Sequence, residues 1–279
     1  MPRIGLLGDD LQLGSLLFWR APRVVVVELH GLLAGRDGAL NLKSVGPVVE
    51  RAFKAAASKN RPAGGHVVLD IDCRGGSPVQ SELIAGLIRR LAAENAATVH
   101  AVIQEVGASG GYWLACAADD IRASAMSIVG SIGVIGGGFG FDELLARAGI
   151  QRRLYTSGEN KARLDPFSPE RPEDVAFVHR LMAEIHERFK AWVRTRRGER
   201  LRGAEDTLFD GSFFLGEQAL ALGLVDGLSD IDRTVRELGG ERAVARVFRP
   251  RRKRRLLGRL LVEAALDAVE ERAGRITLR

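Results

Sequence analysis

Short apolar runs alternate with stretches of helical spacing along the first half of the chain. Three runs have the length and composition of buried strands, and they lie at residues 24–29 (VVVVEL), 66–71 (HVVLDI) and 98–104 (TVHAVIQ). Each run precedes a stretch with helical spacing, and these stretches span residues 48–57, 79–93 and 110–118. Because strands that alternate with helices are typical of parallel sheets with both faces covered, the pattern predicts an α/β fold made of βα units.

The second half of the chain has a less regular pattern. Glycines are frequent between residues 121 and 140, which indicates turns and close backbone packing. A short helix at about residues 142–148 and a strand at 152–155 are expected after them. Pro172 then begins a long helical stretch to about Arg197, because apolar residues recur there at helical spacing. The run FFLGEQALALGLVDGL predicts a short helix, then a strand and a turn.

Length and composition indicate one main folded domain. The 279 residues are 46% hydrophobic, which excludes a disordered chain and predicts a buried core. A single domain usually has roughly 100–200 residues, but α/β domains often reach about 250. We therefore divide the chain into an N-terminal segment (1–22), a main α/β domain (23–240) and a C-terminal tail (241–279). The two cysteines, Cys73 and Cys116, form no disulfide framework and suit a reducing compartment.

The excess positive charge lies in the tail. The whole chain has a net charge of +6 at pH 7, and residues 241–279 hold 12 Lys or Arg against 5 Asp or Glu. The other residues are close to neutral, so a nucleic-acid-binding role is not supported. The tail begins with a basic cluster and continues with an apolar stripe, formed by Leu257, Leu260, Leu261, Ala264 and Ala268. Two roles stay open for it: a peripheral contact with an anionic membrane surface, or docking against another subunit or the body of the protein.

No targeting signal is evident near the N-terminus, where Asp9 and Asp10 interrupt the apolar residues. The longest uncharged stretch, residues 123–141, contains six glycines and three serines, which make it a poor hydrophobic anchor. We therefore expect a soluble, cytoplasmic protein, with the tail as its candidate contact with a membrane.

A serine and a lysine are the main candidates for catalysis. Ser109 lies among small residues where a helix is expected to begin, and Lys161 lies 52 residues later in a glycine-containing loop. A serine hydroxyl must lose its proton to a base before it attacks a carbonyl. A lysine can accept that proton when burial or neighbouring charges lower its pKa. The sequence offers no histidine in an obviously better place.

Two glycine-containing turns are expected near this serine. They span residues 72–78 (DCRGGSP) and 106–111 (VGASGG), and each follows a predicted strand. Ligands gather at the carboxyl ends of parallel strands, where the N–H groups of helix starts are free to bind negative charge. One turn supplies Ser109, and Gly75 or Gly76 of the other would donate an N–H to an oxyanion. The alternative, that both turns only require glycine geometry, stays open at this point.

Four segments of the chain resemble serine peptidases of the S49 family, the signal peptide peptidase A and SohB type. They are the turn at Gly75 and Gly76, the run ASGGYWLACAADDIRAS with GSIGV after it, the run YTSGENKARLDPFSP, and the run GSFFLGEQALALGLVDGLSD. The resemblance implies a ClpP/crotonase-like α/β fold of repeated ββα units, with residues 23–240 as the catalytic domain. It also implies a homo-oligomer that hydrolyses peptide bonds in signal-peptide remnants or other unfolded segments, without a cofactor or a metal.

The resemblance also implies roles for individual residues. Ser109 corresponds to the nucleophile and Lys161 to the general base. Ser131, in GSIGV, corresponds to the residue whose hydroxyl orients the lysine amine. The oxyanion hole is implied to consist of Gly76, its neighbour Gly75 and the N–H of Gly110.

One of the turns departs from the family pattern. Where the family usually has Ser-Pro-Gly-Gly, this chain has Cys73-Arg74-Gly75-Gly76. Loss of the proline removes the restraint on φ and adds an N–H. Arg74 brings a positive charge near the expected site, where it either binds a substrate carboxylate or points to solvent.

Two other functions are compatible with parts of this sequence, and the histidines and cysteines are the other groups with possible chemistry. A crotonase-type acyl-CoA enzyme would use the same turns but has no need of Ser109 together with Lys161. A catalytically silent scaffold would account for the altered turn and the basic tail. His179 and His186 are seven residues apart, whereas a metal pair on a helix prefers a spacing of about four, so both are expected in a surface or core role. Both cysteines are expected to pack in the core.

Overall fold

A single mixed sheet of eight strands forms the centre of the molecule. The computed structural model describes residues 23–57 and 65–250. Within these ranges the strand order is β6-β5-β3-β2-β1-β8, and β4 pairs with β3 and β7. The strands are β1 (Arg23–His30), β2 (His66–Cys73), β3 (Thr98–Ala108), β4 (Asp120–Ala123), β5 (Ile128–Gly130), β6 (Phe213–Leu215), β7 (Gly227–Leu228) and β8 (Val244–Phe248). Only β6 runs antiparallel to its neighbour.

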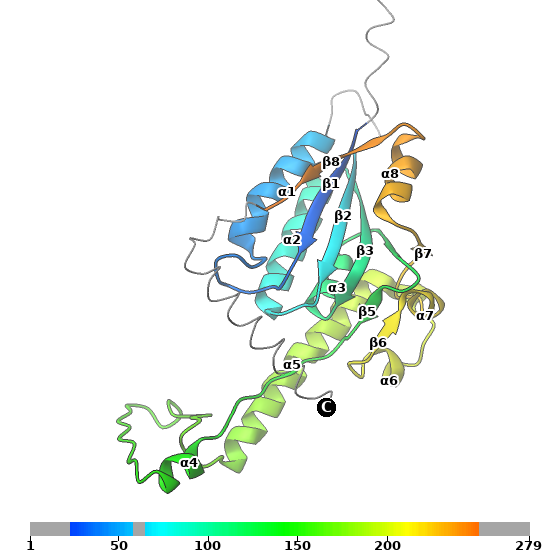
Figure 1. Ribbon diagram of the computed structural model, residues 1–279. Coiled ribbons are helices and arrows are strands. Elements are labelled where there is room, and N and C mark those ends of the chain that lie inside the picture. Colours follow the sequence, from blue (N-terminus) through cyan, green and yellow to red (C-terminus); the bar gives the residue numbers. More distant parts are fainter. Residues whose placement is uncertain (1–22, 58–64, 251–279) are drawn as a thin grey trace, which may run out of the picture.

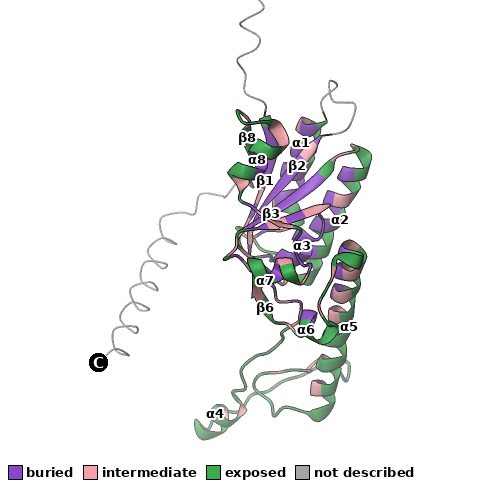
Figure 2. Ribbon diagram, turned by 90° about the vertical axis from the view of Figure 1, so that its right-hand side faces the viewer, coloured by how far each residue is buried: buried purple, intermediate pink, exposed green. Residues whose placement is uncertain are grey.

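Helices cover both faces of this sheet (Figures 1 and 2). The α-helices of the described residues are α1 (Leu42–Ala56), α2 (Pro78–Glu94), α3 (Gly110–Ala115), α4 (Asp142–Arg147), α5 (Pro172–Arg197), α6 (Glu205–Leu208), α7 (Gly216–Ala221) and α8 (Ile231–Gly239), of which α4 lies away from the sheet (Figure 1). Alternate residues of β1 point to opposite sides, as the pleat of a strand requires. Val25, Val27 and Leu29 join the main core with α1, α2 and α3, whereas Val24 and Val26 join a smaller core with α8. This architecture confirms the predicted α/β fold class.

The three predicted βα units are present as β1–α1, β2–α2 and β3–α3, but two details differ from the sequence prediction. No strand forms at residues 152–155, which are all exposed, so the apolar residues of that run have no sheet to join. Residues 244–248, which we assigned to the tail, form β8 and pair with β1. The basic cluster from residue 251 onward and the apolar stripe of the tail lie outside the described residues.

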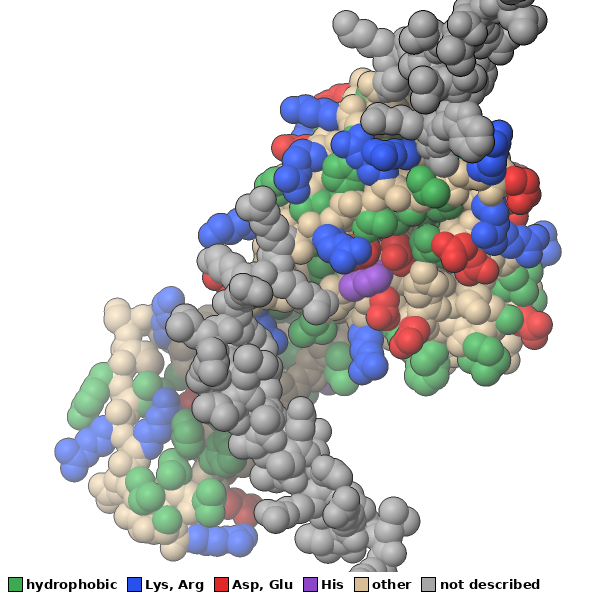
Figure 3. Space-filling model, turned by 45° about the horizontal axis from the view of Figure 1, so that its top comes forward, with side chains coloured by type: hydrophobic (Ala, Val, Ile, Leu, Met, Phe, Trp, Pro, Cys, Tyr) green, Lys and Arg blue, Asp and Glu red, His purple; other side chains and the backbone are tan. Residues whose placement is uncertain are grey.

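On the side of the sheet that α8 covers, polar side chains replace the valines toward the carboxyl ends of β1 and β2. His30 lies 3.1 Å from Asp70, and Glu28 lies 2.9 Å from Arg249. The contact with Asp70 raises the pKa of His30, although burial opposes the rise. Figure 3 shows a histidine with acidic and basic side chains around it on the visible face.

No described helix is both long enough and apolar enough to cross a bilayer.

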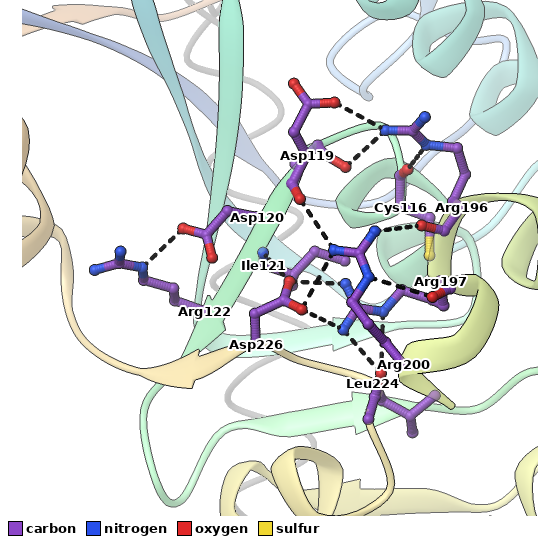
Figure 4. Close-up of polar contacts among 12 residues, drawn as sticks. Cys116, Asp119, Asp120, Ile121, Arg122, Arg196, Arg197, Arg200, Leu224 and Asp226 are labelled. Carbon is purple, nitrogen blue, oxygen red and sulfur yellow. Dashed lines mark hydrogen bonds and ion pairs between the residues drawn. The ribbon is translucent and has the colours of Figure 1, made fainter. Parts of the chain in front are cut away.

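Arginines fasten the C-terminal end of α5 to the body of the protein (Figure 4). Arg197 is only 2% exposed, and two of its nitrogens donate to Asp226 at 2.8 Å. Arg196 donates to the Cys116 carbonyl at 2.8 Å, and Arg200 donates to the Asp119 carbonyl at 3.1 Å. A buried guanidinium is tolerated only when it is paired in this way, so these contacts fix the position of α5.

The other end of α5 extends beyond the sheet together with the segment that contains α4 (Figure 1). We call residues 133–181 the arm. Inside the arm, Arg163 lies over the Phe177 ring at 4.6 Å and within 3.2 Å of Asp174. The first part of α5 therefore packs against the loops that precede it.

Candidate active site

Ser109 lies at a sharp turn between β3 and α3. Its backbone has φ 53° and ψ −123°, a conformation that side-chain-bearing residues rarely adopt and that costs about 1–3 kcal/mol. Two hydrogen bonds hold it: the Ser109 N–H donates to the Gly130 carbonyl at 2.8 Å, and the Ser109 carbonyl accepts from the Trp113 N–H at 3.0 Å. A strained strand-to-helix turn of this kind presents a serine hydroxyl above the sheet while its backbone is fixed.

The glycine turn after β2 touches this serine. A Cβ atom on Gly75 would lie 2.8 Å from the Gly110 nitrogen and 3.0 Å from the Ser109 Oγ, so only glycine permits this approach. The φ angles of Gly75 and Gly76 are 97° and 129°, which also favour glycine. The two turns that the sequence placed after separate strands are therefore in direct contact.

Two backbone N–H groups of these turns are available to an oxyanion. Leu33 bonds to both neighbours of Gly76, since its N–H donates to the Gly75 carbonyl and its carbonyl accepts from the Ser77 N–H, each at 2.8 Å. Because N–H groups alternate in direction along an extended chain, the Gly76 N–H points away from Leu33. Gly110 is the first residue of α3, so its N–H has no partner within the helix. The N–H of Gly75 already donates to the Cys73 sulfur at 3.4 Å. What Gly75 provides is the absence of a side chain, which lets Ser109 approach the turn.

Ser131, like Ser109, has a positive φ angle. Its φ is 51°, and its N–H donates to the Ser212 carbonyl at 2.7 Å. Ala108 of β3 lies opposite Gly130 of β5, so the two serines directly follow a register pair of the sheet. Both serines line one pocket.

This pocket has a volume of about 680 Å³, and both apolar and polar side chains line it. Trp113, Ile185 and Phe189 contribute to the wall, and the ring centroids of Trp113 and Phe189 are 5.1 Å apart. Gly76 and Gly110 also line it, together with the polar side chains of Arg74, His186 and Asp210. A cavity of this size and character fits a side chain of a peptide beside a reacting carbonyl.

Arg74 lies at the rim of the pocket, next to Gly75. Its side chain is exposed and has neither a hydrogen bond nor an ion pair with any described residue. The cation is therefore available to an incoming carboxylate, and this geometry is compatible with either of the roles expected for it.

Lys161 is not part of this pocket in a single chain. It belongs to the arm, where it is exposed, and its N–H donates to the Gly158 carbonyl at 3.2 Å. Figure 1 shows the arm extending away from the sheet, whereas Ser109 lies at the start of α3 within the body. The structure thus brings together Ser109, Ser131 and the glycine turns, and the Ser109–Lys161 pair stays a prediction.

Three polar side chains of the pocket, those of Ser81, His186 and Asp210, were not predicted from the sequence. His186 lies on α5 and its Nε2 is 2.9 Å from the Ile132 carbonyl oxygen. Asp210 accepts from the N–H and the hydroxyl of Ser212 at 2.8 Å, and these bonds lower its pKa. His186 and Asp210 belong to no local sequence motif. Their place at the pocket follows only from the tertiary packing of α5 and of the segment before β6.

The two thiols are buried and unsuited to nucleophilic chemistry. Burial raises the pKa of Cys73 to about 11 and that of Cys116 to about 12. Both thiols are therefore protonated at neutral pH, and the reactive form of cysteine is the thiolate.

The arm is unusually apolar for an exposed segment. It holds eleven of the twenty large hydrophobic side chains that are exposed among the described residues. Ile135 is 97% exposed, Tyr155 is 88% exposed and Phe139 is 80% exposed. Apolar groups gathered in this way usually mark a surface that contacts another protein or a membrane.

Known proteins similar to this chain include proteases. A Haemophilus influenzae protein named as a probable protease SohB is 30% identical over 170 residues, which cover 60% of this chain and 47% of that protein. A Brucella melitensis protein named Na⁺/H⁺ antiporter NhaA is 43% identical over 249 residues, which cover 88% of this chain and 33% of that protein. This chain thus spans about a third of the Brucella relative and about half of the Haemophilus one. Among solved structures, a membrane-bound stomatin-specific protease has a TM-score of 0.49 and 14% identity, covering 83% of this chain and 100% of its own.

A family model gives the decisive match. The model of peptidase family S49 matches residues 92–245, which are more than half of the chain and include Ser109, Ser131 and Lys161. This match confirms the resemblance seen in the sequence: the chain belongs to peptidase family S49.

Proposed function

We propose that the protein is a serine endopeptidase that uses Ser109 as its nucleophile and Lys161 as its general base. The observation that supports this most directly is the contact between the two turns. Ser109 is held in a strained conformation against Gly75, while the N–H groups of Gly76 and Gly110 lie at the same pocket. A nucleophile beside two free N–H groups is the arrangement that acyl transfer requires.

In the proposed reaction, the neutral Lys161 amine takes the proton of Ser109 as Oγ bonds to the substrate carbonyl carbon. The carbonyl oxygen becomes an oxyanion, which accepts hydrogen bonds from Gly76 and Gly110. The ammonium then returns its proton to the leaving amine as the C–N bond breaks, which leaves an ester on Ser109. Water, deprotonated by the same lysine, hydrolyses this ester. Ser131 orients the lysine amine in both steps.

The lysine is proposed to come from a second copy of the chain. In one chain the pocket contains Ser109 but not Lys161, which lies in the exposed arm. The arm also exposes more large hydrophobic side chains than all other described residues together. Docking of the arm on a neighbouring body would cover these groups and place Lys161 in a drier environment, which is what a lysine base requires. A homo-oligomer is therefore part of the proposal.

The proposed substrates are signal-peptide remnants or other unfolded segments. The apolar wall formed by Trp113, Ile185 and Phe189 suits a hydrophobic side chain of such a peptide. Arg74 is proposed to bind a carboxylate of the substrate, because its guanidinium at the rim has no counterion among the described residues.

A fluorophosphonate probe, which reacts with activated serines, tests the proposal. The purified oligomer should be labelled at Ser109, and labelling should be lost in Ser109→Ala and Lys161→Ala. Lys54→Ala, which removes an exposed lysine on α1, is the control and should be labelled like the wild type. An oligomer that is never labelled would instead support a silent scaffold. Labelling that survives in Lys161→Ala would remove the lysine from the mechanism.

A further inference from the structure

The turn formed by Gly130, Ser131, Ile132 and Gly133 is held by three different elements. The Gly130 carbonyl accepts from the Ser109 N–H at 2.8 Å, and the Ser131 N–H donates to the Ser212 carbonyl at 2.7 Å. The third contact comes from α5, where His186 Nε2 is 2.9 Å from the Ile132 carbonyl oxygen. A carbonyl can only accept, so His186 donates this bond through an Nε2–H.

This turn needs support from outside itself. Ser131 has φ 51°, in the left-handed region that side-chain-bearing residues avoid. Its own short-range bond is the one from the Gly133 N–H to the Ser131 carbonyl, at 3.0 Å. Such conformations persist when the surroundings restrain them, and the residue that follows Ser131 is restrained by His186.

We propose that His186 is a positioning residue that holds Ser131 in the orientation needed to align the lysine amine. This inference rests on the proposed function, because it concerns the orienting hydroxyl of the same site. His186 touches neither the scissile bond nor the lysine in this role; it acts through the Ile132 carbonyl. The bond survives protonation of the ring, since the imidazolium also carries an Nε2–H.

The position of α5 makes His186 suitable for this task. The C-terminal end of the helix is fixed by the Arg197–Asp226 pair. Between that pair and His186, the Trp192 indole N–H donates to the Trp113 carbonyl of α3 at 3.0 Å. The same helix thus contacts the Ser109 side of the site through Trp192 and the Ser131 side through His186.

Two substitutions of different reach test the hydrogen bond. In His186→Gln the amide Nε2 lies about as far from the backbone as the histidine Nε2, so the donor is kept. In His186→Asn the donor lies one bond closer to the backbone, and the Ile132 carbonyl is out of reach. We expect kcat for peptide hydrolysis to stay within about threefold in His186→Gln and to fall about 10- to 100-fold in His186→Asn, with KM little changed. Arg188→Gln, at an exposed residue of the same helix that lies outside the arm and the pocket, is the control.

A double-mutant cycle with Ser131→Ala separates positioning from general damage. If His186 acts through Ser131, His186→Asn should have little further effect on kcat once the Ser131 hydroxyl is gone. The proposal would be overturned if the loss of kcat in the double variant equalled the product of the losses in the two single variants. A wild-type kcat in His186→Asn would also overturn it.

Hydrogen exchange of the peptide that contains residues 130–133 gives a readout independent of activity. Exchange should be faster in His186→Asn than in the wild type and should return to the wild-type rate in His186→Gln. Unchanged exchange in His186→Asn would overturn the role of His186 whether or not the enzyme is active. A wild type without activity but with the expected exchange pattern would count against the proposed function alone.

Discussion

The N–H of Ser109 donates to the carbonyl of Gly130 at 2.8 Å, so the turn of the proposed nucleophile and the turn of Ser131 are joined by one hydrogen bond. Both serines have left-handed backbones, with φ 53° and 51°. Each turn on its own would relax toward a more favourable conformation. Their mutual bond, with those from Ser212 and His186, joins the two turns and restrains both of them.

Contact between Ser109 and Gly75 leads to the first prediction. Gly75→Ala would place a Cβ 2.8 Å from the Gly110 nitrogen and from the Ser109 Cβ, on a backbone with φ 97°. We expect labelling of Ser109 to be lost and the free energy of unfolding to fall by about 1–3 kcal/mol. Gly86→Ala is the matched control, because Gly86 lies within α2 with no atom within 4 Å of the new Cβ. It should stabilise the protein by about 0.5–1 kcal/mol and leave labelling intact.

Arg74 should distinguish substrates by charge. We expect Arg74→Gln to raise KM about 10-fold for a peptide with a glutamate near the cleaved bond, because a charge-assisted hydrogen bond is lost. The same peptide with glutamine in place of glutamate should show no change. Arg36→Gln removes an exposed arginine outside the pocket and controls for net charge. Equal KM values for both peptides in the wild type would show that Arg74 points to solvent.

The ion pair between the buried Arg197 and Asp226 predicts how the fold responds to acid. Burial raises the pKa of Asp226, but hydrogen bonds from Arg197 and the Ile121 N–H outweigh it, so the pKa lies below its usual value. A carboxyl with a lowered pKa stabilises the fold above its unfolded pKa of about 4, and this stability is lost as pH falls through the folded pKa.

Asp226→Asn should therefore lower the free energy of unfolding at pH 7 by about 3 kcal/mol, because it leaves a buried guanidinium without its counterion. The decline of stability below about pH 4 should become shallower in this variant. Denaturant unfolding between pH 3 and 7 measures both effects, and Glu205→Gln, at an exposed partner of Arg194, should change neither. A variant as stable as the wild type at pH 7 would show that the pair contributes nothing.

The parts of the site that follow from local sequence could be predicted, and the parts made by tertiary packing could not. Ser109 and the two glycine turns lie at strand ends, where short-range patterns are informative. His186 enters the pocket only because α5 folds back across α3, and no spacing along the chain encodes that. The strand expected at residues 152–155 fails for a related reason: the run has strand composition, but its residues lie in the exposed arm. Residues 244–248 are the converse case, since they form β8 only because the edge of β1 is free to pair.

The arm is predicted to be an interface. Leu144→Glu, on α4, and Tyr155→Glu change side chains that are 62% and 88% exposed, so the fold of one subunit should be unaffected. Each charge would have to be buried when the arm docks, which is strongly unfavourable. We expect sedimentation to show dissociation of the oligomer, with loss of Ser109 labelling at equal protein concentration. Val244→Glu, at an exposed residue of β8, serves as the control for added charge. Variants that stay assembled and labelled would place the interface elsewhere.

Mixing two inactive variants decides whether the base comes from the same chain or from a second copy. Ser109→Ala keeps Lys161, and Lys161→Ala keeps Ser109, so neither homo-oligomer has a complete site. If the arm of one subunit serves the pocket of the next, subunits mixed after dissociation should regain about a quarter of the wild-type activity, because that share of interfaces joins an intact serine to an intact lysine. If the arm folds back on its own pocket, every subunit keeps one defect and no activity returns. The wild type taken through the same dissociation and reassembly gives the reference value. Failure of the mixture to recover while that reference recovers would exclude a shared site and require the arm to move within its own chain.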